Sequence, residues 1–120
     1  MSAARPPALL VAIDTEGDNQ WDAHARRHQT FVNIHRLDRL HEFFARHGVR
    51  PTYVITYPVA RDPQSAAMLR TLLARGECVL IFSEGTRIRP GALGRPKRGV
   101  GRLALETGAP VVPVAVIGTE

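Results

Sequence analysis

The chain has 120 residues and a mass of 13.2 kDa, which is enough for one domain but too little for two complete ones. Its 44% hydrophobic and 22% charged residues are typical of a globular protein and argue against a disordered tail. The net charge is +5, but the basic residues are scattered with few aromatic neighbours, so no nucleic-acid partner is expected. Its single cysteine, Cys78, excludes an internal disulfide, and a cytoplasmic protein without a signal peptide or transmembrane segment is predicted.

Strands and helices are predicted to alternate along the first two thirds of the chain. Residues 8–13 form a continuous apolar run of strand length. Residues 33–47 carry apolar side chains at helical spacing, and residues 52–57 are β-branched and aromatic, which favours a second strand. Residues 62–75 open with Asp-Pro, a pair typical of a helix start.

The same alternation continues to the end of the chain. Residues 78–82 predict a third strand, and a loop rich in Gly, Pro and Arg follows over residues 83–96. Residues 98–107 predict a helix and residues 111–117 a fourth strand, which Pro113 places at an edge. The order predicts an α/β fold: one small layered domain with about four mostly parallel strands and about three helices.

Two carboxylates, Asp14 and Glu16, follow the first predicted strand. Side chains two positions apart point to the same side of a strand, and functional residues of parallel sheets gather at the carboxyl ends of the strands. One acid could then act as a general base while the other binds a metal ion. The alternative is that a loop acid caps a nearby backbone amide, and the spacing alone leaves both open.

The segment around these acids resembles the start of polysaccharide deacetylases of the NodB-homology class. The matching residues are Leu-Val-Ala-Ile-Asp-Thr-Glu-Gly-Asp-Asn at 10–19, with Trp21 behind them, and residues 47–54. The resemblance covers about residues 9–77. It implies a metal-dependent hydrolase that removes acetyl groups from N-acetylated sugars, with Asp14 as catalytic base, Glu16 as metal ligand where the family has aspartate, and a divalent metal such as zinc.

The histidines that this family needs are not at the family position. Its His-x-x-x-His pair follows the third strand, whereas all five histidines here precede residue 48. His24 and His28 have the i, i+4 spacing of a metal-binding pair on a helix. Arginines stand between them, which favours a solvated pair, so they are weak metal-ligand predictions.

The third predicted strand is followed by a second group of polar residues: Glu84, Gly85, Thr86 and Arg87. A glycine turn lets the backbone approach an anion, and the arginine fork matches a phosphate. Lys97 and Arg98 open the next predicted helix, whose amino end also favours anions. From the residues alone, a phosphate site and a solvated basic loop are equally consistent.

These residues resemble lysophosphatidic acid acyltransferases. Ile-Phe-Ser-Glu-Gly-Thr-Arg at 81–87 is similar to their phosphate-binding motif, and residues 94–105 and 110–115 are similar to the blocks that follow it. The resemblance covers about residues 78–120 and implies acyl transfer from a thioester to a lysophospholipid at a membrane surface. The family's catalytic His-x-x-x-x-Asp motif is missing, because no histidine of this chain has an aspartate five positions later.

The two resemblances meet within residues 72–78. We therefore predict a deacetylase-like part over residues 1–77 and an acyltransferase-like part over residues 78–120, packed as one domain and joined from two genes. The leading prediction is a deacetylase with a carbohydrate substrate. The alternatives are an acyltransferase fragment that binds lysophospholipid or an anionic membrane surface peripherally, and a catalytically inactive chimera. Uncovered sheet edges predict a weakly stable chain that self-associates.

Overall fold

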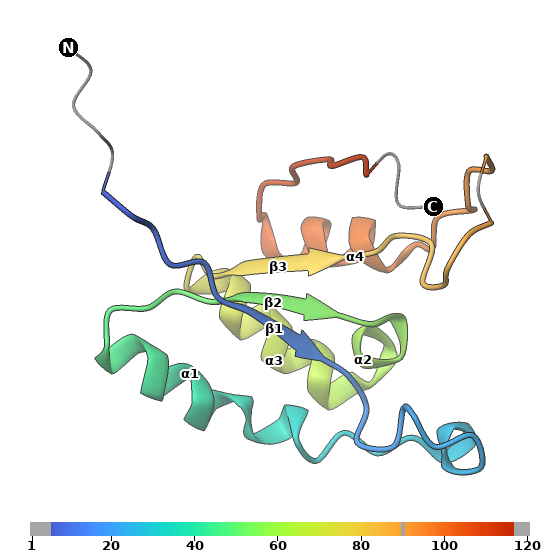
Figure 1. Ribbon diagram of the computed structural model, residues 1–120, viewed down its shortest axis with the longest axis horizontal. Helices are drawn as coiled ribbons and strands as arrows, with labels where there is room; N and C mark the ends of the chain where they lie inside the picture. Colours follow the sequence, from blue (N-terminus) through green and yellow to red (C-terminus); the bar gives the residue numbers. More distant parts are fainter. Residues whose placement is uncertain (1–5, 90, 117–120) are drawn as a thin grey trace.

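Three short strands form a parallel sheet in the order β1-β2-β3 in the computed structural model, which describes residues 6–89 and 91–116 (Figure 1). The strands are β1 (Ala12–Thr15), β2 (Thr52–Ile55) and β3 (Cys78–Ile81). Asp14 is in register with Val54, and Val54 with Leu80, so the three strands end at one edge. The predicted α/β class is confirmed, with parallel strands linked by helices.

In the described part of the chain, four helices accompany the sheet: α1 (Leu37–Arg46), α2 (Tyr57–Arg61), α3 (Pro63–Ala74) and α4 (Gly99–Thr107). Two 3-10 turns, η1 (Ala25–His28) and η2 (Ile34–Arg36), precede α1. Asp62 caps α3 as its sequence predicts, since its carboxylate accepts a hydrogen bond of 2.8 Å from the backbone amide of Ser65.

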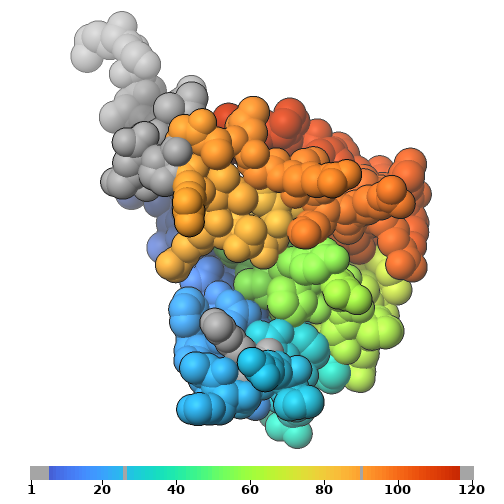
Figure 2. Space-filling view, turned by 90° about the vertical axis from the view of Figure 1, so that its right-hand side faces the viewer, coloured from blue at the N-terminus to red at the C-terminus, as the bar shows by residue number. Residues whose placement is uncertain are grey.

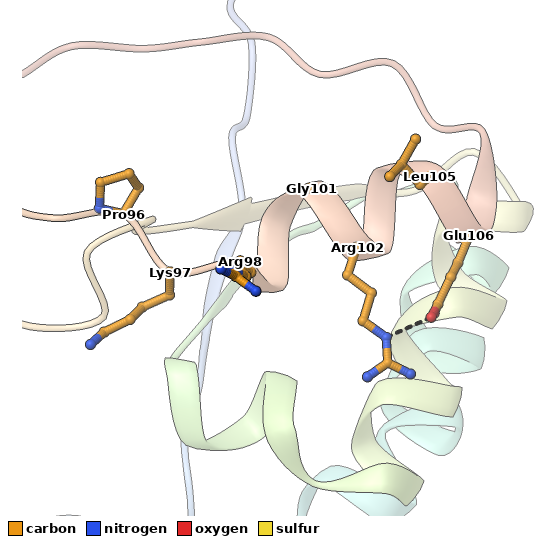
Figure 3. Close-up of a pocket in the computed structure, with 7 residues that line it drawn as sticks. All are labelled: Pro96, Lys97, Arg98, Gly101, Arg102, Leu105 and Glu106. Carbon is orange, nitrogen blue, oxygen red and sulfur yellow. Dashed lines mark hydrogen bonds and ion pairs between the residues drawn. The ribbon is translucent and has the colours of Figure 1, made fainter.

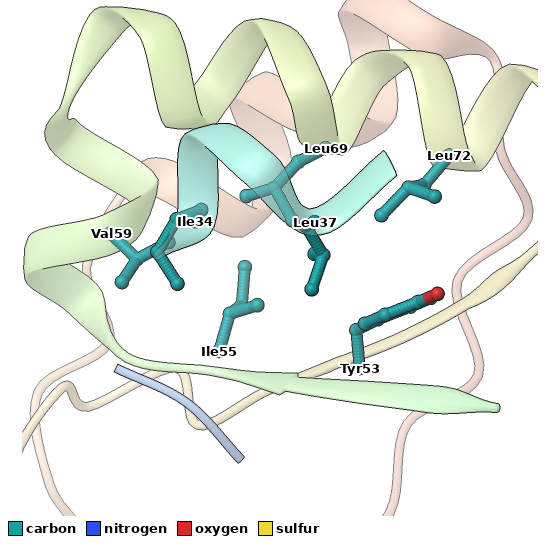
Figure 4. Close-up of a cluster of buried hydrophobic side chains, with 7 residues drawn as sticks. All are labelled: Ile34, Leu37, Tyr53, Ile55, Val59, Leu69 and Leu72. Atoms are coloured by element: carbon teal, nitrogen blue, oxygen red, sulfur yellow. The ribbon is translucent and has the colours of Figure 1, made fainter. Parts of the chain in front are cut away.

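The core lies between one face of the sheet and the helices (Figure 4). Tyr53 and Ile55 project from β2 toward α1, α2 and α3, whose apolar side chains close over them. The cluster consists of Ile34, Leu37, Tyr53, Ile55, Val59, Leu69 and Leu72. The described residues leave the opposite face of the sheet largely open. The alternate strand positions there are half-buried or exposed: Ala12, Asp14, Thr52, Val54, Cys78 and Leu80. One layer of helices therefore buries one side of the sheet.

The amino-terminal end of the sheet holds a polar group of three buried or nearly buried side chains and one exposed arginine. His41 Nδ1 lies 2.8 Å from the Tyr53 hydroxyl, and His41 Nε2 lies 3.9 Å from Glu77 Oε1. Arg50 Nε approaches Glu77 Oε2 at 3.6 Å, an ion-pair distance too long for a hydrogen bond, and its Nη2 donates to the Gly76 carbonyl at 2.6 Å. These side chains tie α1, β2 and the start of β3 together.

Three element predictions need correction. The first strand lies at Ala12–Thr15 and not at 8–13, because β1 pairs with β2 only from Ala12 onward. Helix α2 was missed, since Pro58 occupies its first turn, where proline is tolerated. The predicted strand at 111–117 does not form over residues 111–116, and residue 117 lies outside the described residues; Pro110 and Pro113 bring no amide hydrogen to a ladder. None of the described helices is long and apolar enough to cross a bilayer.

Candidate functional site

The carboxyl ends of all three strands border one open cavity of about 1430 Å³. Asp14 and Glu16 come from the end of β1, Thr56 and Tyr57 follow β2, and the turn at 84–87 follows β3. Figure 2 looks onto this edge, with the segment after β3 (orange) above the segment after β1 (blue). The two groups of polar residues that the sequence predicts as separate sites therefore line one cavity.

The turn of residues 84–87, here called the phosphate turn after the motif that it resembles, has at position 85 a backbone that only glycine suits. The Gly85 amide donates to the Phe82 carbonyl at 3.0 Å, and Gly85 has a φ of +67°. A Cβ atom at this position would lie 2.9 Å from Cβ of Tyr57. The turn therefore packs directly on the start of α2, and its backbone has no room for a side chain there.

Basic side chains gather around the same turn. The Lys97 amide donates to the Ser83 carbonyl at 2.7 Å, which draws Lys97 back beside the phosphate turn. Lys97 Nζ lies 5.8 Å from the centre of the Tyr57 ring, and the guanidinium carbon of Arg61 lies 5.7 Å from it. Both distances suit cation–π contacts. Tyr57 thus supports the glycine turn and holds two cations near it. The sequence did not predict this role, although the aromatic residue lies only two positions after the end of β2.

The opposite wall of the cavity is acidic. Asp14 is exposed and Glu16 half-buried, and Trp21 stands beside them. Within residues 6–89 and 91–116, no ion pair of 4.0 Å or less includes Asp14, Glu16 or Arg87. Charges of both signs thus face the cavity without neutralising one another.

Arg98 lies apart from this cavity, at the amino end of α4. It borders a shallow concavity of about 680 Å³ on the surface of that helix, where Lys97 and Arg102 are its basic neighbours (Figure 3). Glu106 there accepts hydrogen bonds from Arg102 Nε at 2.6 Å and from Arg70 Nη1 at 2.8 Å, and the bond from Arg102 lowers the Glu106 pKa despite partial desolvation. The concavity borders the α3–α4 contact. Lys97 lines it, and Lys97 Cγ would lie 3.7 Å from a Cβ atom on Gly85 of the phosphate turn.

The predicted metal ligands are not brought together. His24 directly precedes η1, and His28 is its last residue. Both are exposed, and neither lines the cavity that Glu16 borders. Over the described residues, no group of three or more His, Cys, Asp or Glu side chains is placed to hold a metal ion. The expectation of zinc came from the deacetylase resemblance and stays untested.

The fold and the site together define a class. A parallel α/β sheet carries a glycine turn and an arginine at its carboxyl edge, with a lysine beside the turn, and functional residues of parallel α/β proteins gather at this edge. The family model for acyltransferases matches residues 21–117, and the chain belongs to this family.

Curated relatives agree with the family match. The chain is 34% identical over 108 residues to the chloroplastic 1-acyl-sn-glycerol-3-phosphate acyltransferase BAT2 of Brassica napus. This match covers 77% of this chain and 31% of the relative. It is 33% identical over 108 residues to the chloroplastic 1-acyl-sn-glycerol-3-phosphate acyltransferase LPAT1 of Arabidopsis thaliana, and this match covers 77% of this chain and 30% of the relative. It is 51% identical over 43 residues to the 1-acyl-sn-glycerol-3-phosphate acyltransferase of Pseudomonas aeruginosa, and that match covers 36% of this chain and 17% of the relative. The chain thus spans about a third of the length of the two plant relatives. No solved structure matches it.

These findings correct the leading functional prediction. The acyltransferase match begins at residue 21, well inside the segment that resembles a deacetylase, and the curated relatives named above are acyltransferases. The prediction of a polysaccharide deacetylase is therefore wrong, and a carbohydrate substrate has no support. An acid after a parallel strand is common to many α/β sites, so the motif around Asp14 was too short to identify a family. The division at residue 77 stays a prediction.

Proposed function

We propose that this chain binds the phosphate of a 1-acylglycerol 3-phosphate, the acyl acceptor named in the descriptions of its relatives. The observation that carries the proposal is Arg87: it leaves the phosphate turn on the cavity wall and has no carboxylate partner among the described residues. An unpaired guanidinium beside a glycine turn offers a planar fork of donors to a phosphate.

Each residue of the turn has a proposed role. Arg87 pairs with the phosphate, and the Thr86 hydroxyl donates a further hydrogen bond to it. Lys97 and Arg98 add positive potential from the start of α4. The Glu84 carboxylate would repel a phosphate, so we assign it to a hydroxyl of the glycerol, from which it accepts a hydrogen bond. Gly85 keeps the backbone close to Tyr57 and leaves the approach to Arg87 open.

The proposal concerns acceptor binding and does not assign the whole reaction to these residues. In acyl transfer, the glycerol hydroxyl attacks a thioester carbonyl, an ester forms, and the thiol leaves once a base has taken the hydroxyl proton. A His–Asp pair does exist in space, with His35 Nε2 3.0 Å from Asp62 Oδ2. Neither residue lines the cavity, and Asp62 also caps α3, so this pair is assigned no part in the transfer.

Isothermal titration of sn-glycerol 3-phosphate tests the proposal without lipid. We expect Arg87→Ala to weaken binding by ~10-fold or more, since a charged hydrogen-bonded contact contributes about 1.5–3 kcal/mol. Arg39→Ala is the matched control, because Arg39 is an exposed arginine of α1 with no ion pair among the described residues. Glycerol should not bind measurably. Equal affinity of Arg87→Ala and wild type would overturn the proposal.

A further inference from the structure

The connection between β3 and α4 is a closed surface loop that carries the phosphate turn. The Lys97 amide donates to the Ser83 carbonyl at 2.7 Å, so residues 83–97 begin and end at one point of the fold. Figure 1 shows this loop leaving the carboxyl end of β3 and returning to the start of α4, and the structure describes all of it except residue 90. Compact loops with adjoining ends are packed by their own side chains. Contacts within the loop therefore decide how the side chains of the phosphate turn are held.

Gly94 is the point where the returning half of this loop meets the phosphate turn. A Cβ atom at this position would overlap Cγ of Glu84 and would lie 2.6 Å from both Cδ1 and Cγ1 of Ile88. Gly94 does not have the positive φ of Gly85, so its backbone conformation suits other residues. Leu93, directly before it, is fully exposed at the mouth of the cavity. Position 94 therefore requires glycine for space and not for conformation.

The side chain that Gly94 admits is the one acidic side chain of this region. Residues 83–105 contain six Lys or Arg and a single acid, Glu84. Glu84 is half-buried and lines the cavity, yet no ion pair of 4.0 Å or less within the described residues includes it. The contact at Cγ restricts the stem from which the carboxylate extends. A carboxylate whose stem is held, and which has no cation as partner, is available to a ligand in the cavity.

We propose that Gly94 is a positioning residue that makes the site selective for a phosphorylated polyol. By admitting the stem of Glu84, it holds the carboxylate where a hydroxyl of the ligand donates to it. The inference rests on the proposed function, which supplies the phosphate contact at Arg87. A site built to hydrogen-bond a hydroxyl discriminates against an analogue without one, because its own polar group is then left without a partner.

Two phosphate esters of equal chain length test this selectivity. Isothermal titration should show that the wild type binds sn-glycerol 3-phosphate roughly 10-fold more tightly than n-propyl phosphate, which has no hydroxyl. Gly94→Ala should abolish most of this preference, because the added Cβ displaces the stem of Glu84. Its affinity for n-propyl phosphate should stay within about twofold of wild type, since the contact at Arg87 is kept. General damage to the loop would instead lower both affinities together.

Gly101→Ala is the matched control for the added methyl group. Gly101 lies in α4, does not have a positive φ, and has nothing within 4 Å of an added Cβ. Both affinities should therefore equal those of wild type. Glu84→Ala should lose the preference as Gly94→Ala does. The double variant should lose no more than either single variant, because the two residues act through one contact.

Four results would contradict the inference: equal affinity of the wild type for the two esters, an unchanged preference in Gly94→Ala, an equal loss of both affinities in that variant, or a larger loss of preference in the double variant. The proposed function is tested separately, by the loss of n-propyl phosphate binding in Arg87→Ala. If the wild type binds both esters equally and Arg87→Ala binds neither, the phosphate site stands and the positioning role of Gly94 fails alone. If the wild type binds neither ester, the proposed function fails and the inference fails with it.

Discussion

The two ends of the sheet treat their polar groups in opposite ways. At the amino-terminal end, His41, Tyr53 and Glu77 are buried or nearly so and have partners, with Arg50 closing the group from the surface. At the carboxyl-terminal end, charges such as Arg87 border an open cavity and have no partner of opposite sign within the described residues. Contacts among buried side chains serve stability even where one oxygen, Glu77 Oε2, has no hydrogen-bond partner, whereas unpaired groups around a cavity are available to a ligand.

The comparison predicts that substitutions near the core and substitutions at the cavity affect different measurements. The first should lower the free energy of unfolding and affect binding only through the folded fraction. The second should change ligand affinity while the unfolding transition stays in place. Matched pairs of one residue type, one member from each region, test this separation.

The largest effect is expected from Leu69→Ala. Leu69 is completely buried between α3 and β2, and its truncation should cost about 2–5 kcal/mol in free energy of unfolding. Since a domain of this size is stabilised by only ~5–15 kcal/mol, urea denaturation followed by circular dichroism should show the loss clearly. Leu93→Ala at the cavity mouth should leave the transition unchanged. A loss below about 1 kcal/mol for Leu69→Ala would mean that the core closes over the gap.

The elements around the core could be predicted from sequence because their patterns are local. Residues 52–57 contain β2, and the Asp-Pro pair begins α3 as expected. The site was harder, since Asp14 and the phosphate turn are some 70 residues apart and meet only because β1 and β3 flank β2 in one parallel sheet. The support from Tyr57 is a packing contact against Gly85, which no sequence spacing contains.

The second effect concerns the glycine of the phosphate turn. Gly85→Ala puts a side chain at a φ of +67° and a Cβ atom 2.9 Å from Cβ of Tyr57, so the turn must move. Glycerol 3-phosphate affinity should fall by ~10-fold or more, because displaced donors lose a charged hydrogen bond of about 1.5–3 kcal/mol. Gly91→Ala is the control: Gly91 has a φ of +76° but nothing within 4 Å of an added Cβ. If both variants bind equally, the contact with Tyr57 does not shape the turn.

The third effect is a loss of stability at the amino-terminal end of the sheet. Tyr53→Phe removes the hydroxyl that meets His41 Nδ1, which should cost about 1 kcal/mol in free energy of unfolding. Burial, with a smaller contribution from Glu77, raises the pKa of Tyr53 above its ordinary value of 10.0. The unfolded chain then loses this proton at lower pH than the folded one, so stability is full below pH 10.0 and falls as pH rises above it.

Tyr57→Phe, at the cavity, is the matched control for that variant. Urea midpoints should be measured from neutral pH to about pH 11. The decrease in the midpoint at alkaline pH should be smaller for Tyr53→Phe than for wild type, because the group with the raised pKa is gone. Tyr57→Phe should keep the wild-type alkaline loss. If Tyr53→Phe shows the same decrease as wild type, another group titrates, and Tyr53 at the amino-terminal end of the sheet does not account for the pH dependence of stability.

The smallest effect tests the acidic wall of the cavity. Glu16 follows β1 and the phosphate turn follows β3, two strand spacings or about 10 Å away, where a carboxylate repels a phosphate by ~0.4 kcal/mol per charge in water. Glu16→Gln should therefore strengthen glycerol 3-phosphate binding about twofold at low salt, with less gain once salt screens the repulsion. Glu42→Gln should leave the affinity unchanged, because Glu42 is an exposed residue of α1 that does not line the cavity. Weaker binding by Glu16→Gln would show instead that Glu16 contacts the ligand, and the two walls of the cavity would then act together on one molecule.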